Sequence, residues 1–274
     1  MNPSPFILIR GAGEMASAVA WRLHRANLHR ICMLELANPL AVRRAVSFCT
    51  AFEDGSHSVE GVTARSARQT ADIEAAWQDQ NIAVVLTTDW QKIADFQPDV
   101  LIDATLAKRN LGTAIDQAAL VIALGPGFEA GTDCHLVIET NRGHNLGRII
   151  ESGSAAPNTG VPGGIGGYTA ERVLRAPAAG AFETDLDIGA MVQAGDVIGV
   201  VAGQKVTAEI DGVLRGLIRN GTEVGSGLKI GDIDPRGETV YCTTISDKAR
   251  ALSGSVLEAI MRSFNQPRGQ DNLN

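Results

Sequence analysis

The sequence predicts an α/β fold, in which a parallel-sheet domain is followed by a small all-β domain and a C-terminal helix. In the first half of the 274 residues, apolar runs alternate with helical patterns, which is typical of a parallel sheet covered on both faces. In the second half, a glycine-rich pattern of short strands occurs twice. Residues 249–264 then place Leu252, Val256 and Ile260 on one stripe of a terminal helix.

The first strand and helix frame a glycine-rich turn. The apolar run of residues 6–9 precedes the segment GAGEMA, which fits the pattern G-x-G-x-x-A. Such a turn brings a ligand close to the backbone and offers it a helix N-terminus, so the segment predicts a Rossmann-like site for a phosphorylated ligand. Its candidate residues are Gly11, Ala12, Gly13, Glu14 and Ala16. The alternative is a turn that binds nothing, because the Glu14 carboxylate would lie close to any phosphate.

Further strands and helices follow from periodicity. Strands are predicted at residues 31–36, 62–65, 82–87, 100–105, 120–124 and 136–139, and helices at residues 13–26 and 68–79. Pro39 suits the first turn of another helix. Ligands of parallel sheets bind beyond the carboxyl ends of the strands, where several polar or glycine-rich segments fall.

These strand ends supply the remaining ligand-binding candidates. Glu35 lies where dinucleotide-binding proteins place a ribose-binding acid, or it is simply a solvated acid. Cations and amides in the loops are typical of an anion site, and the glycines suggest a second loop facing the first. The further candidates are Arg43, Lys108, Arg109, Asn110, Gly125, Gly127 and Arg142. We expect the four cations among them to gather around one crevice.

Composition narrows the functional classes. The net charge of −7 argues against a general nucleic-acid binder, and no apolar run is long enough to span a membrane. The N-terminus lacks the basic region of a signal peptide, and the four scattered cysteines form no C-x-x-C motif. These features predict a cytoplasmic protein. No zinc-ligand spacing is present, so no metal site is predicted. Cys49 is the thiol nearest the polar cluster, either reactive or an inert filler.

The second half contains an internal repeat. Gly180, Gly189 and Gly195 recur 32 residues later as Gly212, Gly221 and Gly227. The pattern resembles the biotinyl/lipoyl, or barrel-sandwich, domain, whose carrier form bears a lysine on a hairpin. The flanks of Lys205 do not match such a carrier hairpin.

Four segments are therefore predicted. They are a Rossmann-like ligand-binding domain (1–150), a glycine-rich connector (151–174), a barrel-sandwich domain (175–247) and a C-terminal helix with its tail (248–274). The long loop from residue 139 to residue 168 is rich in cations, amides and glycines, so we expect it to cover the ligand pocket.

The chain resembles one family over about its full length. The characteristic stretches are RGAGE (10–14), WRLH (21–24), PLAVRR (39–44), KRNLG (108–112), GPGF (125–128), ETNRGH (139–144) and PNTG (157–160). They are similar to the YqeB-type accessory family of selenium-dependent molybdenum hydroxylases. The resemblance implies a first domain like that of the xanthine dehydrogenase accessory factors, and a role in maturing or supplying a molybdenum-cofactor enzyme.

The expected function is thus that of an accessory protein with a molybdenum hydroxylase, or its maturation machinery, as partner. Its ligand would be a nucleotide or a molybdopterin derivative, and a homo-oligomer is left open. One alternative is an NAD(P)-dependent oxidoreductase, although no Tyr-x-x-x-Lys motif supplies a proton donor. The other alternative is a carrier or protein-interaction module built on the second domain.

Overall fold

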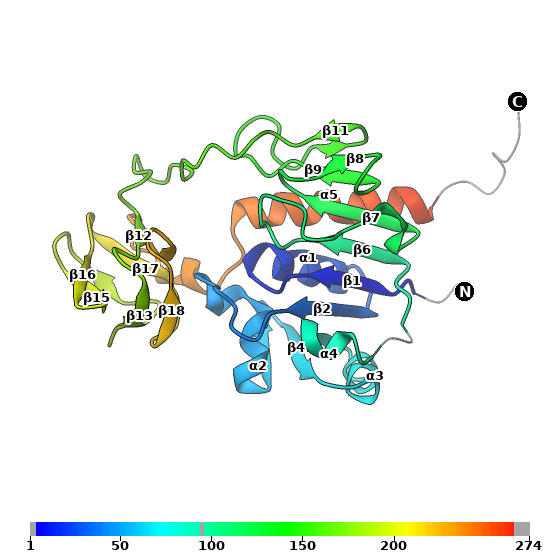
Figure 1. Cartoon of the computed structure of the whole chain (residues 1–274), viewed down its shortest axis with the longest axis horizontal. Helices are drawn as coiled ribbons and strands as arrows, with labels where there is room; N and C mark the ends of the chain where they lie inside the picture. The colour runs from blue at the N-terminus through cyan, green and yellow to red at the C-terminus, as the bar shows by residue number, and fades with distance from the viewer. Residues whose placement is uncertain (1–3, 94–95, 266–274) are drawn as a thin grey trace, which may run out of the picture.

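The computed structural model describes residues 4–93 and 96–265, and a nine-stranded sheet forms its larger part (Figure 1). In spatial order the strands are β10 (Ile149–Ile150), β9 (Leu136–Ile138), β7 (Leu120–Leu124), β6 (Val100–Asp103), β1 (Ile7–Arg10), β2 (Ile31–Glu35), β5 (Ile82–Leu86), β4 (Val62–Ala67) and β3 (Ser56–Val59). The seven inner strands run parallel, whereas β10 and β3 pair antiparallel at the two edges. The sheet is therefore mixed.

Helices cover both faces of this sheet. On one face, α1 (Glu14–Arg25) and α5 (Asp247–Phe264) lie side by side and share one hydrophobic core with the strands. On the other face lie α3 (Thr70–Gln78) and α4 (Thr87–Trp90). Inner strands such as β6 and β7 are buried on both faces, which is why they consist of continuous apolar runs.

Short elements complete this part of the chain. They are α2 (Ala51–Asp54), the two-stranded sheet of β8 (Glu129–Ala130) and β11 (Gly153–Ser154), and the 3-10 turns η1 (Arg44–Val46), η2 (Phe48–Thr50), η3 (Ile115–Gln117) and η4 (Thr239–Cys242).

The C-terminal β-module, residues 173–234, consists of two antiparallel sheets around a core of its own. One sheet has the order β12 (Val173–Arg175), β19 (Lys229–Asp234), β17 (Gly212–Leu217) and β14 (Met191–Val192). The other has the order β16 (Gln204–Thr207), β15 (Val197–Val201), β13 (Gly180–Glu183) and β18 (Thr222–Val224). β14 of the first repeat pairs with β17 of the second, and β18 of the second pairs with β13 of the first. The two copies thus complete each other's sheets.

The predicted fold class is wrong. In place of a Rossmann-like parallel sheet followed by a barrel sandwich, the structure has a mixed nine-stranded sheet and separate antiparallel sheets. The prediction assumed a covering helix between successive strands, but only the three-residue η3 lies between β6 and β7. The face left open there is covered by α5, from the far end of the chain.

Most individual strands and helices lie within about two residues of their predicted bounds, whereas the helix predicted at Pro39 does not form. Only the short turns η1 and η2 occur there. The predicted tail beyond residue 265 lies outside the described residues. In residues 4–93 and 96–265, no helix has both the length and the apolar composition needed to cross a membrane.

Candidate functional site

The glycine turn after β1 is tied to the protein itself. Gly11 has φ +96° and its N–H donates to the Leu34 carbonyl, 2.7 Å away. The Ala12 N–H donates to the Glu35 carboxylate at 2.8 Å, and the Ala12 carbonyl accepts from Cys49 N–H and the Ser17 hydroxyl. Glu35 therefore holds the turn, and two of the N–H groups expected to face a phosphate are already used.

Glu14 and Arg43 form an ion pair beside the turn. Arg43 Nη1 donates to Glu14 Oε1 at 2.8 Å, and Arg43 Nη2 donates to the carbonyls of Tyr241 and Thr244. Arg43 is only 5% exposed. It fastens the start of α1 to the segment that leads into α5, so the expectation that it joins the other cations at one crevice is wrong.

The loop after β6 is ordered by a buried carboxylate. Asp103 Oδ2 accepts from the Thr113 hydroxyl at 2.6 Å, and that hydroxyl accepts from Arg10 Nη1. The Asn110 side chain accepts from the N–H groups of Gly112 and Thr113. Asn110 thus shapes the loop from within, and Arg109 is exposed next to it.

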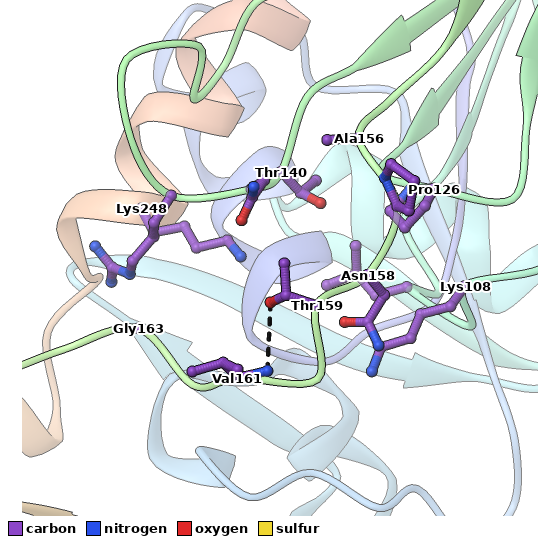
Figure 2. A pocket seen from close by; sticks show the side chains of 13 residues that line it. Lys108, Pro126, Thr140, Ala156, Asn158, Thr159, Val161, Gly163 and Lys248 are labelled. Carbon is purple, nitrogen blue, oxygen red and sulfur yellow. Dashed lines mark hydrogen bonds between the residues drawn. The ribbon is translucent and has the colours of Figure 1, made fainter. Parts of the chain in front are cut away.

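A pocket of about 210 Å³ lies at the carboxyl ends of β6, β7 and β9 (Figure 2). We call it the lysine pocket. Its lining residues are Leu106, Lys108, Pro126, Thr140, Asn141, Arg142, Ala156, Pro157, Asn158, Thr159, Val161, Gly163 and Lys248. Three strand-end loops, the connector and the first turn of α5 therefore meet at this one site.

Buried polar contacts fix the walls of the lysine pocket. Glu139, which is buried, accepts from the N–H of Asn141 and from the N–H of Ala156, both at 2.7 Å, and so joins the β9 loop to the connector. Gly127, with φ +105°, lies so close to the Lys108–Arg109 backbone that a Cβ atom would meet Arg109 N at 2.5 Å. Leu106 and Lys108 themselves have positive φ, a strained backbone that often marks a functional loop.

The charge in the lysine pocket is positive. Arg142 is paired with Asp247, its Nη1 and Nη2 lying 2.8 and 3.1 Å from the two carboxylate oxygens. Neither Lys108 nor Lys248 forms an ion pair or hydrogen bond with any described side chain. Burial, and then the Arg142 charge, lower the pKa of Lys248 below its usual value. Two unpaired amines together with hydroxyls and amides can bind a small anion.

Of the predicted candidates, Lys108 and Arg142 line the lysine pocket, and Gly125 and Gly127 support its walls. Gly11, Ala12, Gly13, Glu14, Ala16, Glu35, Arg43, Arg109 and Asn110 do not line it. Sequence analysis missed Lys248, because a lysine at the start of a terminal helix carries no motif that relates it to a distant strand end.

The described lining of the lysine pocket contains no Cys, His, Asp or Glu residue. Burial raises the pKa of the Cys49 thiol to about 12, which disfavours the thiolate form that reacts as a nucleophile. In the described parts of the chain, no three His, Cys, Asp or Glu side chains come close enough to hold a metal ion.

Comparison with known proteins gives one strong sequence relative. The chain is 49% identical over 260 residues to the uncharacterized protein YqeB of Escherichia coli (strain K12), a match that covers 95% of this chain and 48% of YqeB. The chain thus spans about half the length of that curated relative. No family model matches the chain.

Similarity to solved structures is weak. An aspartoacylase family protein from Mesorhizobium loti is 14% identical, covering 84% of this chain and 85% of its own, with a TM-score of 0.28. A succinylglutamatedesuccinylase/aspartoacylase from Rhodobacter sphaeroides is 22% identical over 23% of this chain and 22% of its own, with a TM-score of 0.22. Scores this low carry no conclusion on fold or chemistry. By sequence, the chain is a homologue of YqeB, matched over nearly all of its own length and about half of that longer protein.

Proposed function

We propose that the lysine pocket binds a small phosphorylated ligand of the nucleotide or molybdopterin type. The observation that carries this proposal is the pair of lysines, Lys108 and Lys248, whose amines have no carboxylate partner among the described residues. In Figure 2, Lys248 enters from the side of α5, and Lys108 lies on the opposite side, beyond Asn158. A ligand between them would contact a cation on each side.

The attraction between the ligand's phosphate and the pocket must come from the lysines themselves, because the chain as a whole has a net charge of −7 and would repel an anion. At 4 Å, a unit charge pair near a protein surface is worth roughly 4 kcal/mol before desolvation is subtracted. The Thr140 hydroxyl and the Asn158 amide add neutral hydrogen-bond donors. Phosphate oxygens accept such bonds well, and the pocket offers no unpaired carboxylate that would repel them.

We further propose that the protein serves the maturation or supply of a molybdenum hydroxylase in the cytoplasm. This step is supported by the family resemblance of the stretches around the lysine pocket, among them KRNLG, ETNRGH and PNTG. The two alternative functions gain no such support. The glycine turn that a nicotinamide cofactor would use is bound to Glu35. Lys205, the residue that a carrier domain would modify, is paired with Val200 in the β15–β16 ladder and is therefore part of a strand.

Replacing Lys108 or Lys248 with methionine should weaken binding of the phosphorylated ligand by about tenfold or more, because one charge-assisted contact is worth roughly 1.5–3 kcal/mol. Titration calorimetry against CTP, NAD, NADP and molybdopterin derivatives measures the effect. The affinity of the wild type should also fall with rising salt, since these contacts are partly open to solvent.

Two variants serve as controls for this experiment. Lys205→Met removes an exposed lysine of the C-terminal β-module and should leave binding unchanged. Gly13→Val tests the glycine turn: a Cβ there meets nothing within 4 Å, so the variant should fold and bind as the wild type does. Loss of binding in Gly13→Val, with binding retained in both lysine variants, would place the ligand at the glycine turn instead.

The accessory role has its own test. In host cells lacking this protein, a molybdenum hydroxylase should accumulate with less molybdenum per polypeptide than in the parent strain. Re-expression of the wild type should restore the molybdenum content, and Lys248→Met should not. Unchanged molybdenum content in the deletion strain would remove the accessory proposal while leaving ligand binding intact.

A further inference from the structure

Lys248 lies in a setting that is unusual for a lysine. It is in the first turn of α5 (Asp247–Phe264), and its half-buried side chain extends into the lysine pocket toward Thr140 and Thr159 (Figure 2). The carboxylate next to it in sequence, Asp247, is held by the Arg142 guanidinium. No described carboxylate lies within ion-pair distance of the Lys248 amine.

Three features disfavour the charged form of this amine. Burial contributes most to lowering its pKa, and the Arg142 charge acts in the same direction. The positive end of the α5 dipole adds to them. Glu14, Glu139 and Asp247 act in the opposite direction but do not outweigh burial. Lys248 is therefore neutral more often than a lysine on the surface, and only the neutral amine is a nucleophile.

We propose that Lys248 forms an imine with an aldehyde or ketone group of an anionic ligand held in the lysine pocket. This inference rests on the proposed function, because the anionic group is what brings the carbonyl to the amine. Lys248 Nζ attacks the carbonyl carbon, the carbon–oxygen bond breaks, and a carbon–nitrogen double bond forms. Both amine hydrogens leave with the carbonyl oxygen as water, so the step needs no oxidant or reductant.

The other pocket residues fit supporting roles. Lys108, on the opposite side of the pocket, is exposed and suited to hold the anionic end of the ligand. The hydroxyls of Thr140 and Thr159 line the space that Lys248 enters and can donate to the carbonyl oxygen as it leaves. The resulting link is covalent but reversible, which would retain a ligand that is scarce or unstable in water.

Reductive trapping tests the proposal. The full chain is incubated with glyceraldehyde 3-phosphate and sodium cyanoborohydride, and adducts are located by peptide mass spectrometry. We expect an adduct on Lys248 that forms about tenfold or more faster than on exposed Lys205, because binding of the phosphate raises the local aldehyde concentration. Propionaldehyde, which has no anionic group, should show no such preference. As the pH is raised, the trapping rate at Lys248 should begin to increase at a lower pH than is usual for a lysine, because its pKa is lowered.

Lys248→Arg is the matched variant, since it keeps the positive charge but cannot form an imine. It should still bind glycerol 3-phosphate, which lacks a carbonyl, and should give no preferred adduct. Equal labelling of Lys248 and Lys205 by glyceraldehyde 3-phosphate, with glycerol 3-phosphate still bound by the wild type, would overturn the imine and spare the proposed function. If glycerol 3-phosphate does not bind and Lys248 is not preferred, both proposals fall.

Discussion

Replacing Asp232 with asparagine should lower the free energy of unfolding by about 3–5 kcal/mol, because it leaves buried positive charges without a partner. Asp232 is fully buried in β19. Its Oδ2 accepts from Arg215 Nε at 3.0 Å and from Arg215 Nη2 at 2.7 Å, and its Oδ1 accepts from Arg172. Asparagine preserves the volume of the side chain and removes only the charge. Chemical denaturation followed by circular dichroism measures the loss.

The same carboxylate predicts a pH dependence. Burial by itself raises the pKa of Asp232, but Lys229, Arg215 and Arg172 outweigh it and leave the pKa below the ordinary value of 3.8. A group with a depressed pKa in the folded state stabilises the protein above its unfolded pKa, and this contribution is lost as the pH falls. The wild type should therefore lose stability below about pH 4, and the difference from Asp232→Asn should shrink there.

Asp79→Asn is the control for the Asp232 experiment. Asp79 also pairs with an arginine, Arg65, but both side chains are about half exposed. Removal of an exposed ion pair costs roughly 0–1 kcal/mol. Equal losses of unfolding free energy in the two variants would show that the buried charge network around Asp232 stabilises the fold no more than an exposed ion pair does.

Gly127→Ala should both destabilise the protein and abolish binding in the lysine pocket. At φ +105° an added Cβ would lie 2.5 Å from Arg109 N and 2.6 Å from Arg109 Cα. These are backbone atoms, so no side-chain rotation relieves the clash, and the loop that carries Lys108 must move. Denaturation and calorimetry with the phosphorylated ligand measure the two effects.

Gly131→Ala is the control that separates the cost of backbone strain at a positive φ from the effect of displacing the Lys108 loop. Gly131 lies on the same connection with φ +88°, but its Cβ would meet nothing within 4 Å. It should therefore carry only the cost of a left-handed backbone, roughly 1–2 kcal/mol, and bind as the wild type does. Wild-type affinity in Gly127→Ala would mean that the contact between Gly127 and the Lys108 loop does not shape the pocket.

Local hydrophobic periodicity predicts most of the strands but does not predict how they are arranged in the sheet. The apolar runs predict strands at residues 100–105 and 120–124, because a strand buried on both faces is apolar throughout. No apolar pattern predicts the antiparallel edge strands β3 and β10, since β3 is largely polar and β10 is two residues long. The fold class was wrong for a different reason, because no local pattern specifies which helix covers which face of the sheet.

The candidate site was also predicted only in part. Glycines and cations at strand ends pointed to the loops after β6, β7 and β9, and these loops do meet in the lysine pocket. The glycine turn after β1 gave the strongest motif, yet Glu35 occupies its Ala12 N–H group. A motif specifies residue types and spacing, but a carboxylate from the next strand decides whether the N–H groups remain available.

Local sequence is sufficient to predict most strands of the large sheet, the repeat in the second half, and the polar, glycine-rich loops that follow the strands. These properties depend on neighbours within a few residues or on the comparison of one segment with another. The burial of Arg43 against Glu14 and the placement of Lys248 and Lys108 in the lining of one pocket follow from the tertiary structure alone. The charge and reactivity of a side chain depend on burial and on partners distant in sequence, and these exist only once α5 has packed beside α1.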